Sequence, residues 1–136
     1  MYVEIAELRE YLHIESASED HILKDCILDA QSQIESYTGR LFSVSEDTTR
    51  SFTVGVDTKE RDLYFDEDIC VITSIVTNAD NGSGGEELAL SDYFVYPRNR
   101  TPYFKVRLAE SSSKSWKYTN NPEGGVTVTG RWGYSV

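Results

Sequence analysis

The side chains of this 136-residue sequence that could do catalytic or metal chemistry are two histidines, two cysteines and twenty-three acidic residues. Neither His13 nor His21 has a Ser or Cys nucleophile at a recognisable catalytic spacing. No Cys/His set has zinc spacing. Residues 78–82 lack the leading Asp and the closing Glu of a calcium loop. These patterns predict a protein that is not an enzyme and holds no metal or cofactor.

A basic hairpin is the strongest candidate for a binding site. Arg98 and Arg100 lie in residues 97–102, which connect two aromatic, β-branched runs at 93–96 and 103–108. Lys105 and Arg107 are two apart on the second run, so their side chains point to the same face. Arg131 is a weaker addition. Three interpretations stay open: contact with an acidic protein surface at a subunit interface, contact with phosphates in a DNA channel, and protection of a sheet edge.

The charge of the chain is unevenly distributed. The net charge is −6 over residues 1–42, −9 over residues 43–96 and +5 over residues 97–136, which gives −10 in all. This distribution argues against binding DNA over the whole surface. It favours either self-association, in which a basic face meets an acidic one, or a soluble protein whose surface charge is simply uneven.

Helical periodicity marks the N-terminal third. The spacing of Ile5, Leu8 and Leu12 predicts a short helix over residues 4–12. Residues 16–19, Ser-Ala-Ser-Glu, fit a capping box at the start of a longer helix that ends at Gly39. Its apolar stripe contains the following residues: Ile22, Leu23, Cys26, Ile27, Ala30, Ile34 and Tyr37. We expect Cys26 to be buried there and to form no disulfide with Cys70.

Leu28 is the one large apolar residue nearly opposite this stripe. It is either a singly exposed leucine, which is common, or a candidate helix-face contact with the β half or with a neighbouring subunit.

From residue 50 the period changes to two, which is typical of strands. Phe52, Val54 and Val56 alternate with small residues, and residues 63–65, 69–77, 93–96, 103–108 and 126–132 follow as extended runs. We expect Phe104 in the core, and a turn or mobile loop at residues 78–85. The order predicts an α+β fold, in which an N-terminal helix pair precedes an antiparallel region of five or six short strands. We expect a single domain over residues 1–136, with a helical part (1–42) and a β-rich part (43–136).

No apolar run approaches the length of a membrane span, and the first residues contain no basic region or apolar signal core. We therefore expect no membrane partner and no secretion.

The order of several segments resembles the head–tail connector (adaptor) proteins of tailed phages. Residues 5–12 resemble their first helix, and residues 34–42, Ile-Glu-Ser-Tyr-Thr-Gly-Arg-Leu-Phe, resemble the signature that ends their second. Residues 63–69, 72–75, 92–97 and 126–134 (Val-Thr-Val-Thr-Gly-Arg-Trp-Gly-Tyr) resemble landmarks of a β insertion that some members contain. Family members usually continue beyond this last segment into helical sequence that helps engage the portal.

The resemblance implies a structural virion protein without catalytic residues. Such proteins form a homo-oligomeric ring, commonly of twelve subunits, beneath the portal protein. The ring extends the channel for double-stranded DNA and docks stopper or tail-completion proteins. The implied location is the neck of the virion, after synthesis in the host bacterial cytoplasm.

A carbohydrate- or protein-binding β module of a phage tail or bacterial protein is the alternative. Its candidate stacking residues are Tyr93, Tyr96, Tyr103, Trp116 and Tyr118. This alternative accounts for the second half of the chain but not for the N-terminal helices.

Overall fold

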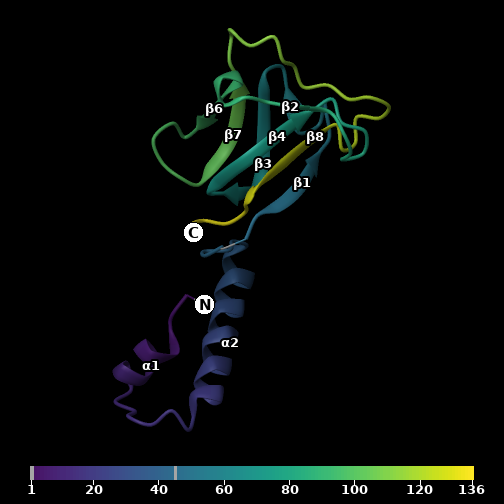
Figure 1. The fold of residues 1–136 in the computed structure, drawn as a ribbon. Helices are drawn as coiled ribbons and strands as arrows, with labels where there is room; N and C mark the ends of the chain where they lie inside the picture. The colour runs from purple at the N-terminus through teal and green to yellow at the C-terminus, as the bar shows by residue number, and fades with distance from the viewer. Residues whose placement is uncertain (1, 45) are drawn as a thin grey trace.

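A computed structural model describes residues 2–44 and 46–136. It consists of a helical arm (residues 2–38) that extends from a β body (residues 46–136), as Figure 1 shows. The arm contains α1 (Ile5–Tyr11) and α2 (Asp20–Thr38). The predicted α+β class, with two helices before antiparallel strands, is confirmed.

The start of α2 differs from the prediction. The helix begins at Asp20, and the Ser16 hydroxyl accepts a hydrogen bond from the backbone N–H of Ser18 (3.1 Å) within the preceding turn. The capping box expected at Ser16 is therefore wrong, because a serine side chain can satisfy a local turn instead of a helix end. The side chain of Glu7 accepts a bond from the Glu4 backbone at the start of α1 (2.9 Å), as in a capping box.

The end of α2 is as predicted. Gly39 has a φ of 68°, in the left-handed region that glycine adopts without a steric penalty, and its N–H donates to the carbonyl of Glu35 (2.8 Å). The chain can therefore turn sharply out of the helix into the β body.

The β body contains eight strands in two antiparallel sheets. One sheet has the order β1–β8–β4–β5, and its strands are β1 (Thr48–Phe52), β8 (Val126–Arg131), β4 (Val71–Thr77) and β5 (Glu86–Glu87). The other has the order β2–β3–β7–β6, and its strands are β2 (Thr58–Lys59), β3 (Asp62–Ile69), β7 (Tyr103–Leu108) and β6 (Tyr93–Tyr96). A short 3₁₀ helix, η1 (Leu90–Asp92), precedes β6. The strand number exceeds the predicted five or six because β2 and β5 are too short to show a period.

Strand β8 is central to the first sheet. It pairs with β1 from Phe52↔Val126 to Thr48↔Gly130, and on its other side with β4. Its first three residues, 126–128, are all buried, so both faces of the strand are covered at that end.

Two details of the predicted strands are wrong. Val54 and Val56 lie in a turn after β1, and Val56 is 80% exposed, because the Asp57 carboxylate accepts the Thr53 N–H and closes the chain on itself. Phe104 is 53% exposed, although the alternate residues Val106 and Leu108 are buried. The register between β3 and β7 shifts at Phe104, so the alternation that buries Val106 and Leu108 does not extend to this residue.

The core fills the space within the β body. It contains Phe52, Leu63, Phe65, Ile69, Ile75, Leu88, Val106, Leu108, Trp116, Val126, Val128 and Trp132. The rings of Phe52, Phe65 and Trp132 form a mutually contacting trio, with centroids 5.5–5.8 Å apart. The Trp132 indole N–H donates to the carbonyl of Thr48 (2.9 Å), and Arg50 lies over the indole face.

A junction joins the arm to the body. It is formed by residues 40–44, after α2, and residues 133–135, after β8. The N–H of Tyr134 donates to the carbonyl of Leu41, and the N–H of Val44 to that of Ser135 (3.0 Å). The Phe42 ring contacts those of Tyr2 and Tyr134. Two segments about ninety residues apart in the sequence thus hold the arm in place.

Both cysteines are free thiols, in agreement with the expected absence of a disulfide. Cys70 is buried, and burial raises the pKa of its thiol. Cys26 is exposed, so its predicted burial is wrong. The stripe of α2 is covered only at Leu23 and Ile27, which are its two buried residues.

Neither of the two α-helices of the described chain has the length and apolar character that crossing a bilayer requires.

Candidate interaction surfaces

The predicted basic hairpin exists. Strands β6 and β7 pair antiparallel, and residues 97–102 connect them. Lys105 and Arg107 share a face, as their spacing predicted, and Arg107 lies opposite Asp62 in the register of β7 against β3. The carboxylate oxygens of Asp62 lie 3.6 Å from the ammonium nitrogen of Lys105 and 3.5 Å from a guanidinium nitrogen of Arg107. The carboxylate therefore offsets much of the positive charge of this row.

Arg131 is also paired, with Asp47 at 3.5 Å. The two remaining candidates differ: within residues 2–44 and 46–136, no carboxylate forms an ion pair with Arg98 or Arg100. The guanidinium of Arg98 lies over the exposed ring of Phe94, 4.6 Å from its centroid. The unpaired positive charge of the hairpin is thus concentrated in its connecting loop.

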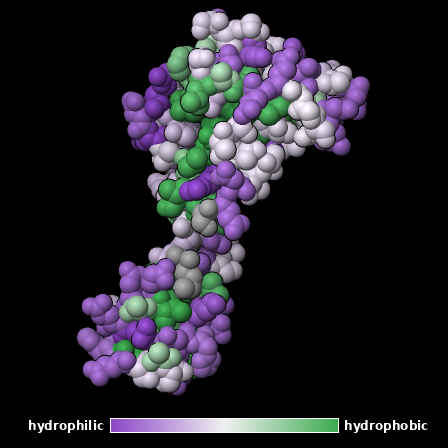
Figure 2. Space-filling model, in the orientation of Figure 1, coloured by the Kyte–Doolittle hydropathy of each residue, from purple (hydrophilic) through white to green (hydrophobic). Residues whose placement is uncertain are grey.

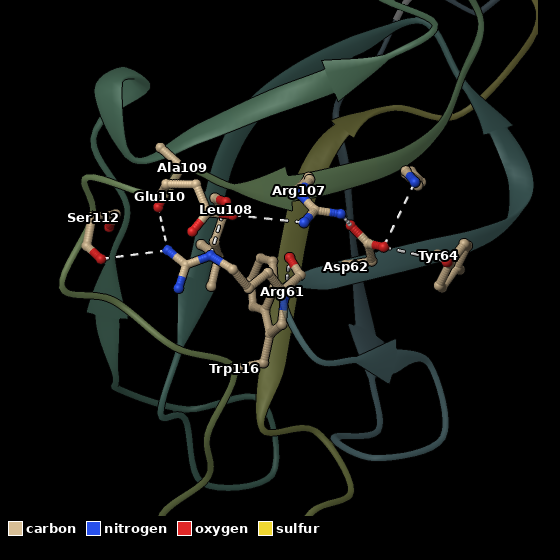
Figure 3. A network of polar contacts seen from close by, with 10 residues as sticks. Arg61, Asp62, Tyr64, Arg107, Leu108, Ala109, Glu110, Ser112 and Trp116 are labelled. Atoms are coloured by element: carbon tan, nitrogen blue, oxygen red, sulfur yellow. Dashed lines mark hydrogen bonds and ion pairs between the residues drawn. The ribbon is translucent and has the colours of Figure 1, made fainter.

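A polar network that sequence reasoning missed lies beside this hairpin (Figure 3). The guanidinium of Arg61 donates to the backbone carbonyls of Leu108 (3.2 Å), Ala109 and Ser112 (3.4 Å). The carbonyl of Arg61 in turn accepts the indole N–H of Trp116 (3.0 Å). Arg61 thereby fixes the chain that leaves β7. The sequence contains no signal for this role, because all three acceptors are backbone atoms about fifty residues away.

Replacing Arg61 with Met should destabilise the β body by about 2–3 kcal/mol, because buried carbonyls lose charge-assisted donors while the aliphatic stem is retained. The urea midpoint measures this loss. Lys59→Met is a matched control, since Lys59 is exposed and pairs with no carboxylate in the described part of the chain. Equal midpoints for the two variants would contradict the role of Arg61.

The helical arm presents an apolar groove of about 300 Å³. It lies between the N-terminal segment with α1 and the stripe of α2, and its walls are Tyr2, Val3, Leu8, Cys26, Ile27, Ala30, Gln31 and Ile34. Figure 2 shows apolar side chains gathered between the two helices on one face of the arm. Tyr2 donates a hydrogen bond to Glu35; burial, and then this bond, raise the pKa of its phenol.

Apolar exposure extends beyond the groove. No residue of α1 is buried, and Ile22 and Ile34 of α2 are about half exposed, while Tyr37 is 94% exposed. Leu28 is 42% exposed, so the β half does not cover it, and contact with a neighbouring subunit stays a prediction. An isolated exposed leucine is ordinary, but a continuous apolar stripe is typical of an interaction surface.

The aromatic residues proposed for sugar stacking do not form one exposed platform. Trp116 is buried in the core, and its indole N–H bonds to Arg61. Tyr96 is covered by Lys105, whose ammonium lies 4.9 Å from the ring centroid, whereas Tyr118 is 45% exposed. Trp116, the largest ring proposed for sugar stacking, is therefore not available to a carbohydrate ligand.

No group of three or more His, Cys, Asp or Glu side chains in the described ranges 2–44 and 46–136 is arranged to hold a metal ion. Comparisons with protein-family models, curated proteins and solved structures find no match to this chain.

Proposed function

We propose that this chain is a structural subunit of a tailed-phage head–tail connector, an adaptor that forms a ring beneath the portal. The observation that carries the proposal is the helical arm, whose apolar groove and half-exposed stripe project from a β body with its own core. Burying an apolar face of this extent against a partner is favourable, and exposed faces of this kind are typical of interaction sites. This arrangement suits a protein that works by assembly.

The segments that carry the resemblance also meet in space. Residues 34–42 and 126–134 come together at the junction, where Tyr134 bonds to Leu41 and Arg40 lies over the Tyr134 ring at 5.6 Å. Arg40 also pairs with Asp68 at 3.2 Å. Each of these segments is short, and neither alone is specific for the connector family. Their contact at the junction supports treating the two as one signature.

In this proposal the partners are further copies of the chain, the portal protein and a stopper or tail-completion protein, and the location is the virion neck. A closed ring requires a heterologous interface, with two different faces on every subunit. The arm and the β body supply different faces. Double-stranded DNA would pass through the ring without sequence-specific contacts, since the acidic body repels phosphate.

The test is reconstitution with the portal protein encoded in the same genome. We expect electron microscopy of the mixture to show a ring of this chain on one end of the portal, and native mass spectrometry to give its subunit number. A portal from an unrelated phage is the control. A portal from the same genome that recruits no more chain than the control would contradict the proposal, as would flanking genes unrelated to capsids and tails.

A further inference from the structure

The apolar groove of the arm lies in an acidic setting. Residues 1–42 contain nine acidic and three basic side chains. Two of those bases are already engaged, Arg9 with Asp20 at 3.1 Å and Arg40 with Asp68 at 3.2 Å. One carboxylate lies at the groove itself, since Glu35 accepts a hydrogen bond from the hydroxyl of Tyr2 in the groove wall. The groove therefore combines an apolar floor with a negative surround.

This charge argues against the simplest occupant, the same groove of a second copy. Two such arms face to face would bring like charges together, which weakens association. The occupant that fits best combines exposed apolar side chains with unpaired cations.

The described part of the chain has one surface on which two unpaired cations and exposed apolar side chains lie together. Of its thirteen basic side chains, eight form ion pairs: Arg9, Arg40, Arg50, Lys105, Arg107, Lys114, Lys117 and Arg131. Arg61 bonds to carbonyls. The bases without an ion pair in the part of the chain that the structure describes are Lys24, Lys59, Arg98 and Arg100, and only the last two lie close together.

Exposed rings flank these two arginines. Phe94, at 43% exposure, lies under Arg98, and Phe104, at 53%, lines the same hollow as Arg100. Arginine next to an exposed aromatic ring is a frequent combination at the centre of protein interfaces.

We propose that the apolar groove of one copy receives the β6–β7 hairpin, residues 94–104, of a second copy. Phe94 or Phe104 covers the groove, and Arg98 and Arg100 meet the surrounding carboxylates. The inference rests on the proposed function in that copies of the chain associate, and it adds which surfaces meet. Because the two surfaces differ, the contact is heterologous and can propagate into a ring.

The exposed thiol of Cys26, in the groove wall, gives a direct test. Asn99→Cys places a second thiol between the two arginines, at an exposed loop position, without removing a cation. We expect a short bismaleimide to join residue 26 of one full-length chain to residue 99 of another about tenfold faster than in the Val56→Cys control. Val56 is 80% exposed on a different turn, and the native Cys70 is buried.

The charge contribution is tested in the Asn99→Cys background. Arg98→Glu with Arg100→Glu should slow the 26–99 cross-link about tenfold, and added salt should slow it in the parent. Lys59→Glu with Lys117→Glu makes the same change in net charge elsewhere and should leave the rate unchanged.

A 26–99 rate equal to the Val56→Cys control, or a product dominated by 26–26 linkage, would overturn the inference. Portal-bound rings without the 26–99 linkage would also overturn it while the connector proposal stands. The 26–99 linkage in a chain that the portal does not recruit would support the inference and contradict the connector function.

Discussion

Trp132→Ala is expected to destabilise the protein by about 3–5 kcal/mol, the range for removing a large buried ring. The substitution removes a ring that is 3% exposed and contacts both Phe52 and Phe65. It also leaves the carbonyl of Thr48 without its indole donor and Arg50 without its aromatic partner. Because domains are stable by only about 5–15 kcal/mol, such a loss removes a large share of the total.

Urea unfolding followed by far-UV circular dichroism measures this effect without relying on tryptophan fluorescence, to which Trp132 contributes. Trp132→Phe should cost less, since it keeps an aromatic ring in the trio and loses only the indole N–H and part of the volume. Tyr118→Ala, at a ring that is 45% exposed, is a matched surface control. A Trp132→Ala variant within about 1 kcal/mol of the parent would contradict the central role of the trio.

Gly133→Ala is expected to loosen the arm from the β body. A methyl group at residue 133 would overlap the Cγ2 atom of Val44 and lie 3.0 Å from the carbonyl of Leu41. That carbonyl is the acceptor for Tyr134 in the junction. Overpacking at such a site costs about 1–3 kcal/mol, and here the loss falls on the junction rather than on the core. Limited proteolysis should then cut the segment between α2 and β1 at least several-fold faster.

The rescue for this variant is Val44→Ala. Truncating Val44 removes the atom that the new methyl group would overlap, so the double variant should regain much of the protease resistance of the parent. Val56→Ala, at an exposed valine of the β body, should rescue nothing. Equal cleavage rates for the single and double variants would show that the overlap with Val44 is not the cause.

Much of the fold follows from local patterns. The period of α2 and the αL conformation at Gly39 are predictable because helix propensity and glycine chemistry act over a few residues. The β6–β7 hairpin and β8 follow from β-branched and aromatic runs bounded by turn residues. The start of α2 was misplaced because a serine next to a helix can cap it or close its own turn, and the sequence does not distinguish these.

The candidate site is less predictable because it depends on contacts between distant segments. The spacing of Lys105 and Arg107 predicts a positive row, but its partial cancellation by Asp62 depends on the register of β3 against β7. The same register determines the exposure of Phe104 and the acceptors of Arg61. In the arm, the apolar stripe of α2 and the short length of α1 are readable in the sequence, whereas the exposure of Cys26 and Ile34 beside α1 is a property of the packing.

The central position of β8 has a consequence for the order of folding. Strand β8 lies between β1 and β4, so the first sheet cannot close until residues 126–131 are available, and its pairing with β1 joins Phe52 to Val126. Contacts at such sequence separation form slowly, because the intervening chain must first lose its conformational freedom. The β6–β7 hairpin and α2 are local and can form early. During refolding, pulse-labelled hydrogen exchange should therefore protect the amides of β8 and of the junction after those of α2, so the arm becomes anchored only in the last step.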